Sequence, residues 1–128
     1  MFSSFRHSPF GYALHELILD PAGNPYDFRF LEMNEAFTQL TGRDSSSLIG
    51  KTAREVIPNI STESFDWFVF FGTIVRDKKN GEIEQYFSSI DRWFKVYAYY
   101  VEENRFAAIF MDVTSDHRRA EELEGFFS

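Results

Sequence analysis

Histidine and acidic side chains are the residues of this chain most able to carry out chemistry, and their spacing argues against catalysis. The three histidines, His7, His15 and His117, fall in separate segments without the H-x₃-H or H-E-x-x-H spacing that brings two metal ligands to one helix face. The acid pairs Glu102-Glu103 and Glu121-Glu122 fall in a turn and on a polar helix face, where charged residues are normally solvated. The chain also lacks cysteine, a nucleophile elbow and a glycine-rich phosphate loop. We therefore predict no catalytic and no metal-binding residues.

The composition indicates one folded domain with a large aromatic core. A chain of 128 residues can bury one core but not two, and 44% of its residues are apolar, including 16 phenylalanines. The net charge of -7, with no basic stripe, argues against nucleic acid as a partner. The longest apolar run, Trp67 to Val75, is far shorter than the roughly 20 residues that span a bilayer. Because no signal-peptide pattern occurs either, we expect a cytoplasmic domain without membrane contact.

The first third of the chain has the pattern of a β-hairpin. β-capable residues run from Gly11 to Leu19 and from Tyr26 to Met33, with turn-forming residues at 20–25 between them. Strict alternation in the second strand predicts two different faces. One face carries Phe28, Phe30 and Glu32, and the other carries Arg29, Leu31 and Met33.

Short helices are predicted after the hairpin. Asn34 can cap the first through its side-chain oxygen, and Gly42 can end it in a left-handed conformation. A further helical turn is expected over residues 44–50. Thr52 opens another with a capping box, and Pro58 ends it.

A longer helix and a three-stranded meander are predicted to follow. Ser61 or Thr62 can cap the helix, which reaches about Arg76 and is apolar nearly all the way round, so both of its sides must be covered. The three β-rich runs cover residues 83–90, 93–101 and 106–113. A polar helix over residues 116–125 ends the pattern.

Both faces of the middle strand of the meander carry large side chains. Phe94, Val96, Ala98 and Tyr100 alternate with Trp93, Lys95, Tyr97 and Tyr99. A sheet whose outer face is also apolar needs a second cover. We expect this cover to be either a second copy of the chain, giving a homodimer, or the N-terminal residues of the same chain.

Several short motifs fall in a fixed order along the chain. They are Asn34-Glu35-Ala36-Phe37, Thr41-Gly42, Leu48-Ile49-Gly50-Lys51, Trp93 and Asp112-Val113-Thr114. Their order and separation resemble the pattern of a PAS domain, the small α+β sensor module found upstream of histidine kinases, diguanylate cyclases and related signalling outputs. The resemblance runs from about Pro9 to Thr114.

The resemblance implies a fold and a division of the chain. We expect an α+β domain over residues 9–114, with a five-stranded antiparallel sheet in the spatial order 2-1-5-4-3 and helices on one face. Residues 1–8 would be an N-terminal flanking segment. Residues 115–128 would be an exit helix and linker to an output domain or a second PAS domain, since Phe126 and Phe127 have no core of their own to join.

In the family, the inner face of the sheet and the long helix enclose a cavity that can hold a ligand. Strand register then implies a set of candidate ligand-binding residues: His15, Leu17, Met33, Phe37, Phe68, Phe71, Phe94, Val96, Ala98 and Phe110, with Leu31, Leu40 and Ala108 beside them. The alternative is a solid aromatic core without a ligand, because apolar residues at strand spacing form core by default. A neutral imidazole at His15 can anchor a ligand carboxylate or hydroxyl, but a backbone carbonyl can also satisfy it.

No cofactor is predicted for this chain. The flavin-adduct sensors and cinnamyl-type photoreceptors of the family need a cysteine, which the chain lacks. Its familiar haem sensors place the axial histidine on the long helix, and residues 61–76 contain no histidine. Non-covalently held FAD stays open.

The resemblance implies a non-catalytic sensor and relay module. A bound small molecule, or a change in a partner, would shift the exit helix between two states and so bias the output. Two alternatives belong to other classes. One is a ligand-free dimerisation module, and the other is a small pocket enzyme or carrier in which His15 is a general base.

Overall fold

The computed structural model describes residues 10–57 and 59–127. The roles predicted for residues 1–8 and for Pro58 lie outside that part of the chain.

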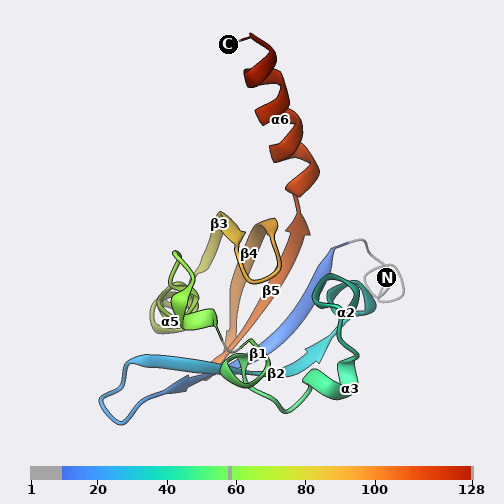
Figure 1. The fold of residues 1–128 in the computed structure, drawn as a ribbon. Helices are drawn as coiled ribbons and strands as arrows, with labels where there is room; N and C mark the ends of the chain where they lie inside the picture. The colour runs from blue at the N-terminus through green and yellow to red at the C-terminus, as the bar shows by residue number, and fades with distance from the viewer. Residues whose placement is uncertain (1–9, 58, 128) are drawn as a thin grey trace.

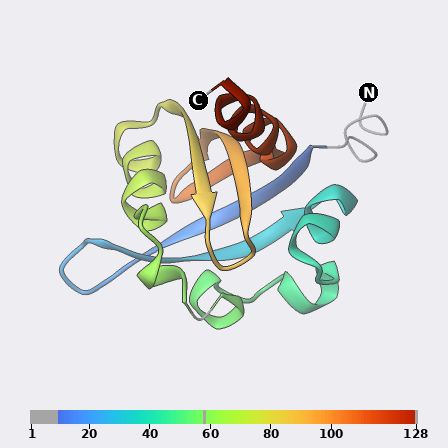
Figure 2. The ribbon, with the colours of Figure 1, turned by 45° about the horizontal axis from the view of Figure 1, so that its top comes forward.

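A five-stranded antiparallel sheet forms the centre of the fold, and its order β2-β1-β5-β4-β3 confirms the predicted one (Figure 1). The strands are β1 (Gly11–Leu19), β2 (Pro25–Met33), β3 (Asn80–Phe87), β4 (Arg92–Glu102) and β5 (Arg105–Asp112). The helical segments are α2 (Glu35–Thr41), α3 (Ser45–Leu48), α4 (Ala53–Val56), η1 (Ile60–Thr62), α5 (Trp67–Asp77) and α6 (Thr114–Phe127). Figures 1 and 2 show α2 to α5 along one side of the sheet, while α6 leaves the end of β5 and extends away from it.

Local capping chemistry explains the first helix after the hairpin. The side-chain oxygen of Asn34 accepts a hydrogen bond from the Phe37 N–H at 3.0 Å, and Gly42 ends the helix with a φ of 71°. The same oxygen accepts from the Tyr12 N–H at 2.9 Å, and the Asn34 amide donates to the carbonyl of Phe10. Asn34 therefore starts α2 and ties it to the first strand.

β2 pairs with β1 through a bulge that changes which of its residues face the helices. Residues 14 and 15 of β1 pair with Glu32 and Phe30, so Leu31 has no partner opposite it. One extra residue reverses the alternation of side chains beyond it. Phe28 and Phe30 consequently lie on the core side of the strand together with Met33. Strict alternation had predicted these two residues on the face opposite Met33, and that prediction was wrong.

The long helix begins later than predicted. α5 starts at Trp67 after Asp66, whose side chain accepts a hydrogen bond from the Val69 N–H at 3.1 Å. Ser61 and Thr62 lie instead in η1, and the residue after them is extended, with φ -63° and ψ 147°. The prediction that either hydroxyl caps the long helix was wrong, because the chain leaves helical geometry between that turn and α5.

α5 packs against the β1–β2 hairpin at the point where Gly72 of α5 meets Pro25 of β2. A Cβ added at Gly72 would lie 2.3 Å from Cγ of Pro25, closer than packed atoms can approach. Glycine inside a helix is less favourable than alanine by about 1 kcal/mol. Here it permits a helix–strand contact that any side chain would block.

The core between sheet and helices is built largely from aromatic rings. Its largest fully buried side chains are Phe71, Phe106, Leu48, His15 and Val96. Phe71 and Phe106 stack with centroids 4.4 Å apart and planes at 21°, so α5 is joined to the middle of the sheet by ring contacts. None of the helices in the described ranges is long and apolar enough to cross a membrane.

Candidate functional site

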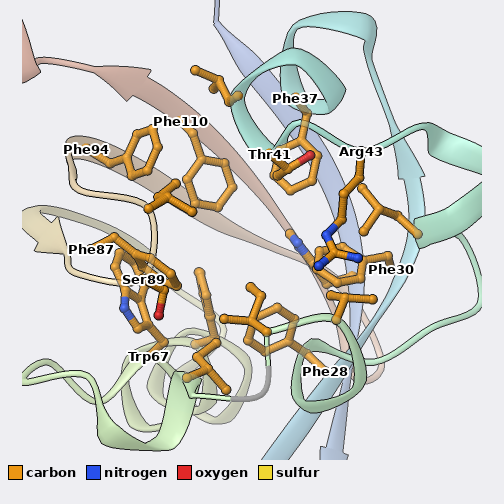
Figure 3. A pocket seen from close by; sticks show the side chains of 18 of the residues that line it. Phe28, Phe30, Phe37, Thr41, Arg43, Trp67, Phe87, Ser89, Phe94 and Phe110 are labelled. Atoms are coloured by element: carbon orange, nitrogen blue, oxygen red, sulfur yellow. The ribbon is translucent and has the colours of Figure 1, made fainter.

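A cavity of about 300 Å³ lies between the inner face of the sheet and the helices (Figure 3). Its buried walls include the rings of Phe28, Phe30 and Phe71. Solvent-exposed residues also line it, among them Arg43 and Ser89, so the cavity opens to the surface there. This volume lies at the lower end of the range of roughly 300–1,000 Å³ that is usual for small-molecule pockets.

Half of the predicted ligand-binding residues line this cavity. They are His15, Phe37, Phe71, Phe94 and Phe110, and Leu40 lines it as well. Leu17, Phe68, Val96 and Ala98 are buried core residues that are not part of the lining, and Met33 packs at the edge of the core. The register prediction therefore found the inner faces of β1, β4 and β5, while ligand binding by these residues stays a prediction.

The lining residues that the sequence prediction missed come from two places. Phe28 and Phe30 were missed because the bulge in β2 is invisible in a pattern of alternation. Most of the others lie on short helices and turns, such as Leu48 and Arg43, or at the ends of longer elements, such as Trp67 at the start of α5 and Phe87 at the end of β3. One usable signal was available for Arg43, since it directly follows the left-handed Gly42 that turns the chain after α2.

His15 is wholly buried and projects to the inner side of the sheet, as predicted. Its imidazole stacks on Phe106 with centroids 4.7 Å apart and lies edge-on to Phe28 at 5.1 Å. Neither ring nitrogen has a hydrogen-bond partner in the described part of the chain. A buried polar group without a protein partner is uncommon in folded proteins, and it occurs where the structure is strained or where a ligand or water binds.

Burial lowers the pKa of His15 to about 3. The backbone of Phe106 opposes this shift, although it does not reach the geometry of a hydrogen bond to the ring. The imidazole is therefore neutral at physiological pH, with one N–H donor and one acceptor nitrogen. It can bind an uncharged polar group but cannot supply a positive charge.

A hydrogen-bonded clamp fixes one wall of the cavity. The Glu63 carboxylate accepts bonds from the backbone N–H of Ser88 and Ser89 at 2.7 and 3.1 Å, and from their hydroxyls at 2.8 and 2.6 Å. Burial alone would raise the pKa of Glu63, but the bonds from Ser89 and Ser88 outweigh it and lower that pKa. The clamp ties the segment before α5 to the turn between β3 and β4.

The exit helix α6 joins the outer face of the sheet at its first turn. The rings of Trp93 and His117 stack with centroids 3.8 Å apart and planes at 5°, and His117 Nε2 lies 2.7 Å from a carboxylate oxygen of Glu84. The Trp93 N–H donates to the Thr114 hydroxyl, and the Thr114 N–H donates to the Asp112 carboxylate, both at 2.9 Å. A carboxylate and a hydroxyl therefore fix the helix start.

A family profile described as "PAS domain" matches residues 3–76, which is more than half of the chain. This chain belongs to the PAS domain family. PAS domains are generally non-catalytic sensor modules of signalling proteins, and the five-stranded sheet with its helices on one face is the fold of that family. No match to the sequence was found among curated proteins.

Solved structures support the PAS fold at low sequence identity. A domain of an HTR-like protein from Haloarcula marismortui has 17% identity and a TM-score of 0.61, with 84% of this chain and 100% of that chain covered. A domain of a sensory box sensor histidine kinase/response regulator from Geobacter sulfurreducens has 12% identity and a TM-score of 0.59, with 87% and 90% covered. An RNA-binding Light-Oxygen-Voltage receptor has 16% identity and a TM-score of 0.61. There the match covers 98% of this PAS domain and 35% of the receptor.

Proposed function

We propose that this PAS domain binds a small organic molecule in the cavity and relays its presence through α6 to an output domain or a further sensor domain. The observation that carries the proposal is the buried His15, whose two ring nitrogens have no partner among the described residues although the ring lines the cavity. An unsatisfied buried polar group destabilises a protein by about 1–3 kcal/mol. A ligand with a hydroxyl or carbonyl group at this point would offset that loss.

The cavity and the exit helix lie on opposite faces of the same strand. Phe94 lines the cavity, and the preceding residue, Trp93, stacks on His117 of α6. Phe94 also pairs with Asp112, whose carboxylate accepts the hydrogen bond that starts the helix. A ligand that displaces the Phe94 ring would therefore act on the helix start through one or two residues of β4 and β5. Such a relay needs only a difference in ligand affinity between two states of the helix.

Two alternative functions receive less support. A general base needs a pKa near the operating pH, and burial holds the pKa of His15 at about 3. Its ring contacts are Phe28, Phe30, Phe71 and Phe106, with no acid among them. A ligand-free dimerisation module would leave the His15 nitrogens without the partner that their burial calls for.

Native mass spectrometry of freshly purified protein tests the proposal. A mass excess that disappears on denaturation, and that is absent from a His15→Leu variant, is the expected result. His117→Leu is the matched control, because that histidine lies outside the cavity on α6. A protein that carries no ligand and binds none from a library of small organic acids, alcohols and amides would contradict ligand sensing and favour the dimerisation module.

A further inference from the structure

We infer that the ligand is an apolar organic carboxylate whose anionic end is held by Arg43. This inference rests on the proposed function, because it assigns a chemical class to the molecule in the same cavity. It uses a residue that neither the sequence patterns nor the family match singles out.

Arg43 stands at the opening of the cavity. The residue directly follows Gly42, whose left-handed conformation ends α2 and turns the chain. Figure 3 shows the guanidinium group reaching from the end of α2 toward Phe30, beside Thr41. The side chain is solvent-exposed at the same time, so a group bound there would sit at the mouth rather than in the interior.

The guanidinium group of Arg43 has no partner among the described residues. Other arginines engage oxygen atoms: Arg29 donates to the Gly50 carbonyl at 2.6 Å, and Arg118 pairs with Asp91 at 3.4 Å. No such ion pair or side-chain hydrogen bond is formed by Arg43 within residues 10–57 and 59–127. An arginine presents a planar set of N–H donors that matches a carboxylate in a two-point contact.

The charges of the lining favour a single negative charge at this point. No aspartate or glutamate of the described residues lines the cavity, and His15 is neutral. Arg43 is thus the one charged side chain of the described lining. A doubly charged phosphate would have a single cation to neutralise it, whereas one carboxylate is matched by one guanidinium.

The remaining walls determine the body of the ligand. They are mainly phenylalanine rings together with Leu48, Val56 and Ile60. Small polar anions would gain nothing from such walls, while an aromatic or aliphatic chain would bury its surface against them. The volume of about 300 Å³ suits a body the size of a phenylalkyl chain.

Matched probes separate the charge from the apolar body. Binding of 4-phenylbutanoate and of 4-phenylbutan-1-ol, which differ in charge but little in shape, is measured by titration calorimetry. The proteins are the wild type, Arg43→Gln and the control Arg76→Gln, since Arg76 lies on α5 outside the cavity and pairs with Asp77. In the wild type and the control, the carboxylate should bind roughly tenfold or more tightly than the alcohol, and the alcohol should compete with it.

The Arg43→Gln variant should remove this preference and bind both probes with affinities within about twofold of each other. Equal binding of the two probes by the wild type would overturn the carboxylate inference and leave the proposed cavity function intact. A preference for the carboxylate over the alcohol that survives in Arg43→Gln would overturn the role of Arg43 and likewise leave the proposed cavity function intact. Failure of both probes to bind any of the three proteins would also overturn the inference of an apolar carboxylate, while the proposed function would fail only if native mass spectrometry and the ligand library likewise showed no binding.

Discussion

His15 occupies a position where an apolar side chain would pack without leaving a polar atom unsatisfied. The rings around it belong to Phe28, Phe30, Phe71 and Phe106, and neither of its nitrogens has a partner among the described residues. Replacing a buried polar group that has no partner differs from breaking a hydrogen bond. It removes the desolvation cost of that group, whereas breaking a hydrogen bond removes a stabilising interaction. In the proposed function, His15 therefore lowers the stability of the ligand-free protein and supplies the polar group that a ligand contacts.

The His15→Leu variant should separate those two effects. We expect its ligand-free form to unfold with a free energy about 1–3 kcal/mol higher than that of the wild type, because a buried unsatisfied group is replaced by an apolar one. Ligand binding should weaken by about 1–3 kcal/mol, because the polar group of the ligand loses the imidazole as its hydrogen-bond partner. Urea denaturation and calorimetry measure the two quantities. A variant that is less stable and binds as well as the wild type would show that the imidazole is satisfied internally.

The same residue makes the protein sensitive to mild acid. Burial lowers the pKa of His15 in the folded protein to about 3, from an ordinary value of 6.5. Below pH 6.5 the unfolded chain binds a proton that the folded chain does not. The stability that the protein gains from the depressed pKa of neutral His15 is therefore complete above pH 6.5, and it is lost progressively as the pH falls toward 3. Between about pH 7 and about pH 5, the wild type should lose about 2 kcal/mol more than His15→Leu. Parallel pH profiles in urea denaturation would mean that the ring titrates normally.

At the scale of the elements, the clamp at Glu63 controls the wall formed by the turn between β3 and β4. Replacing Glu63 by glutamine keeps its shape but removes the charge and one acceptor oxygen. We expect a loss of about 1–2 kcal/mol in the free energy of unfolding, together with faster hydrogen exchange at the amides of Ser88 and Ser89.

A surface acid on β3 provides the control for this clamp. Glu82 forms an exposed ion pair with Lys95 at 3.3 Å, so Glu82→Gln should change stability by no more than about 0.5 kcal/mol. Equal effects of the two substitutions would show that the Glu63 bonds are no stronger than an ordinary surface pair.

The exit helix is predicted to be only partly protected from hydrogen exchange. Its first turn is held by the Trp93–His117 stack, whereas residues 118–123 are exposed, including Leu123 at 54%. Isolated helical turns without packing are marginal in water. The amides of residues 119–123 should therefore exchange much faster than those of β5. His117→Ala should spread fast exchange to the helix start, and Arg119→Ala, on the exposed side, should not. Complete protection through residue 123 in the wild type would leave the relay without a moving part.

Local signals explain which elements the sequence could predict. The helix between Asn34 and Gly42, the hairpin and the meander each have their own caps, turns or alternation, so they were predicted correctly, whereas the strand order was expected from the resemblance to PAS domains. The bulge at Leu31 was missed because it depends on pairing with β1, and the start of α5 was missed because Asp66 caps it locally instead of Ser61 or Thr62. Strand register identified the cavity-facing strands but not Arg43, which lies in the segment after α2.

At the scale of the whole molecule, the outer face of the sheet is a candidate interface. Tyr97, Tyr99 and Ile109 are half-buried there, and the paired strands bring Tyr97 opposite Ile109. We propose that a second copy of the chain packs on this face across a two-fold axis and buries more than about 1,000 Å². Aromatic residues are enriched in such interfaces.

Charge placed at the centre of this face should disrupt the association. Sedimentation should show a dimer for the wild type at high micromolar concentration and a monomer for Tyr99→Asp. The control is Val69→Asp, since Val69 is exposed on α5 on the other side of the sheet. A wild type that sediments only as monomer would contradict the homodimer and leave the outer face to other partners.

The positions of the two tryptophans give the molecule a pair of built-in optical reporters. Trp67 lines the cavity, and Trp93 lies against the His117 ring, where close stacking quenches indole fluorescence. In Trp67→Phe, the only tryptophan emission therefore comes from Trp93 beside α6. In Trp93→Phe, it comes only from Trp67 in the cavity wall. The proposed ligand binding and helix release can thus be timed separately in one unlabelled protein. A lag of the Trp93 signal behind the Trp67 signal would give the rate of the proposed relay through the sheet.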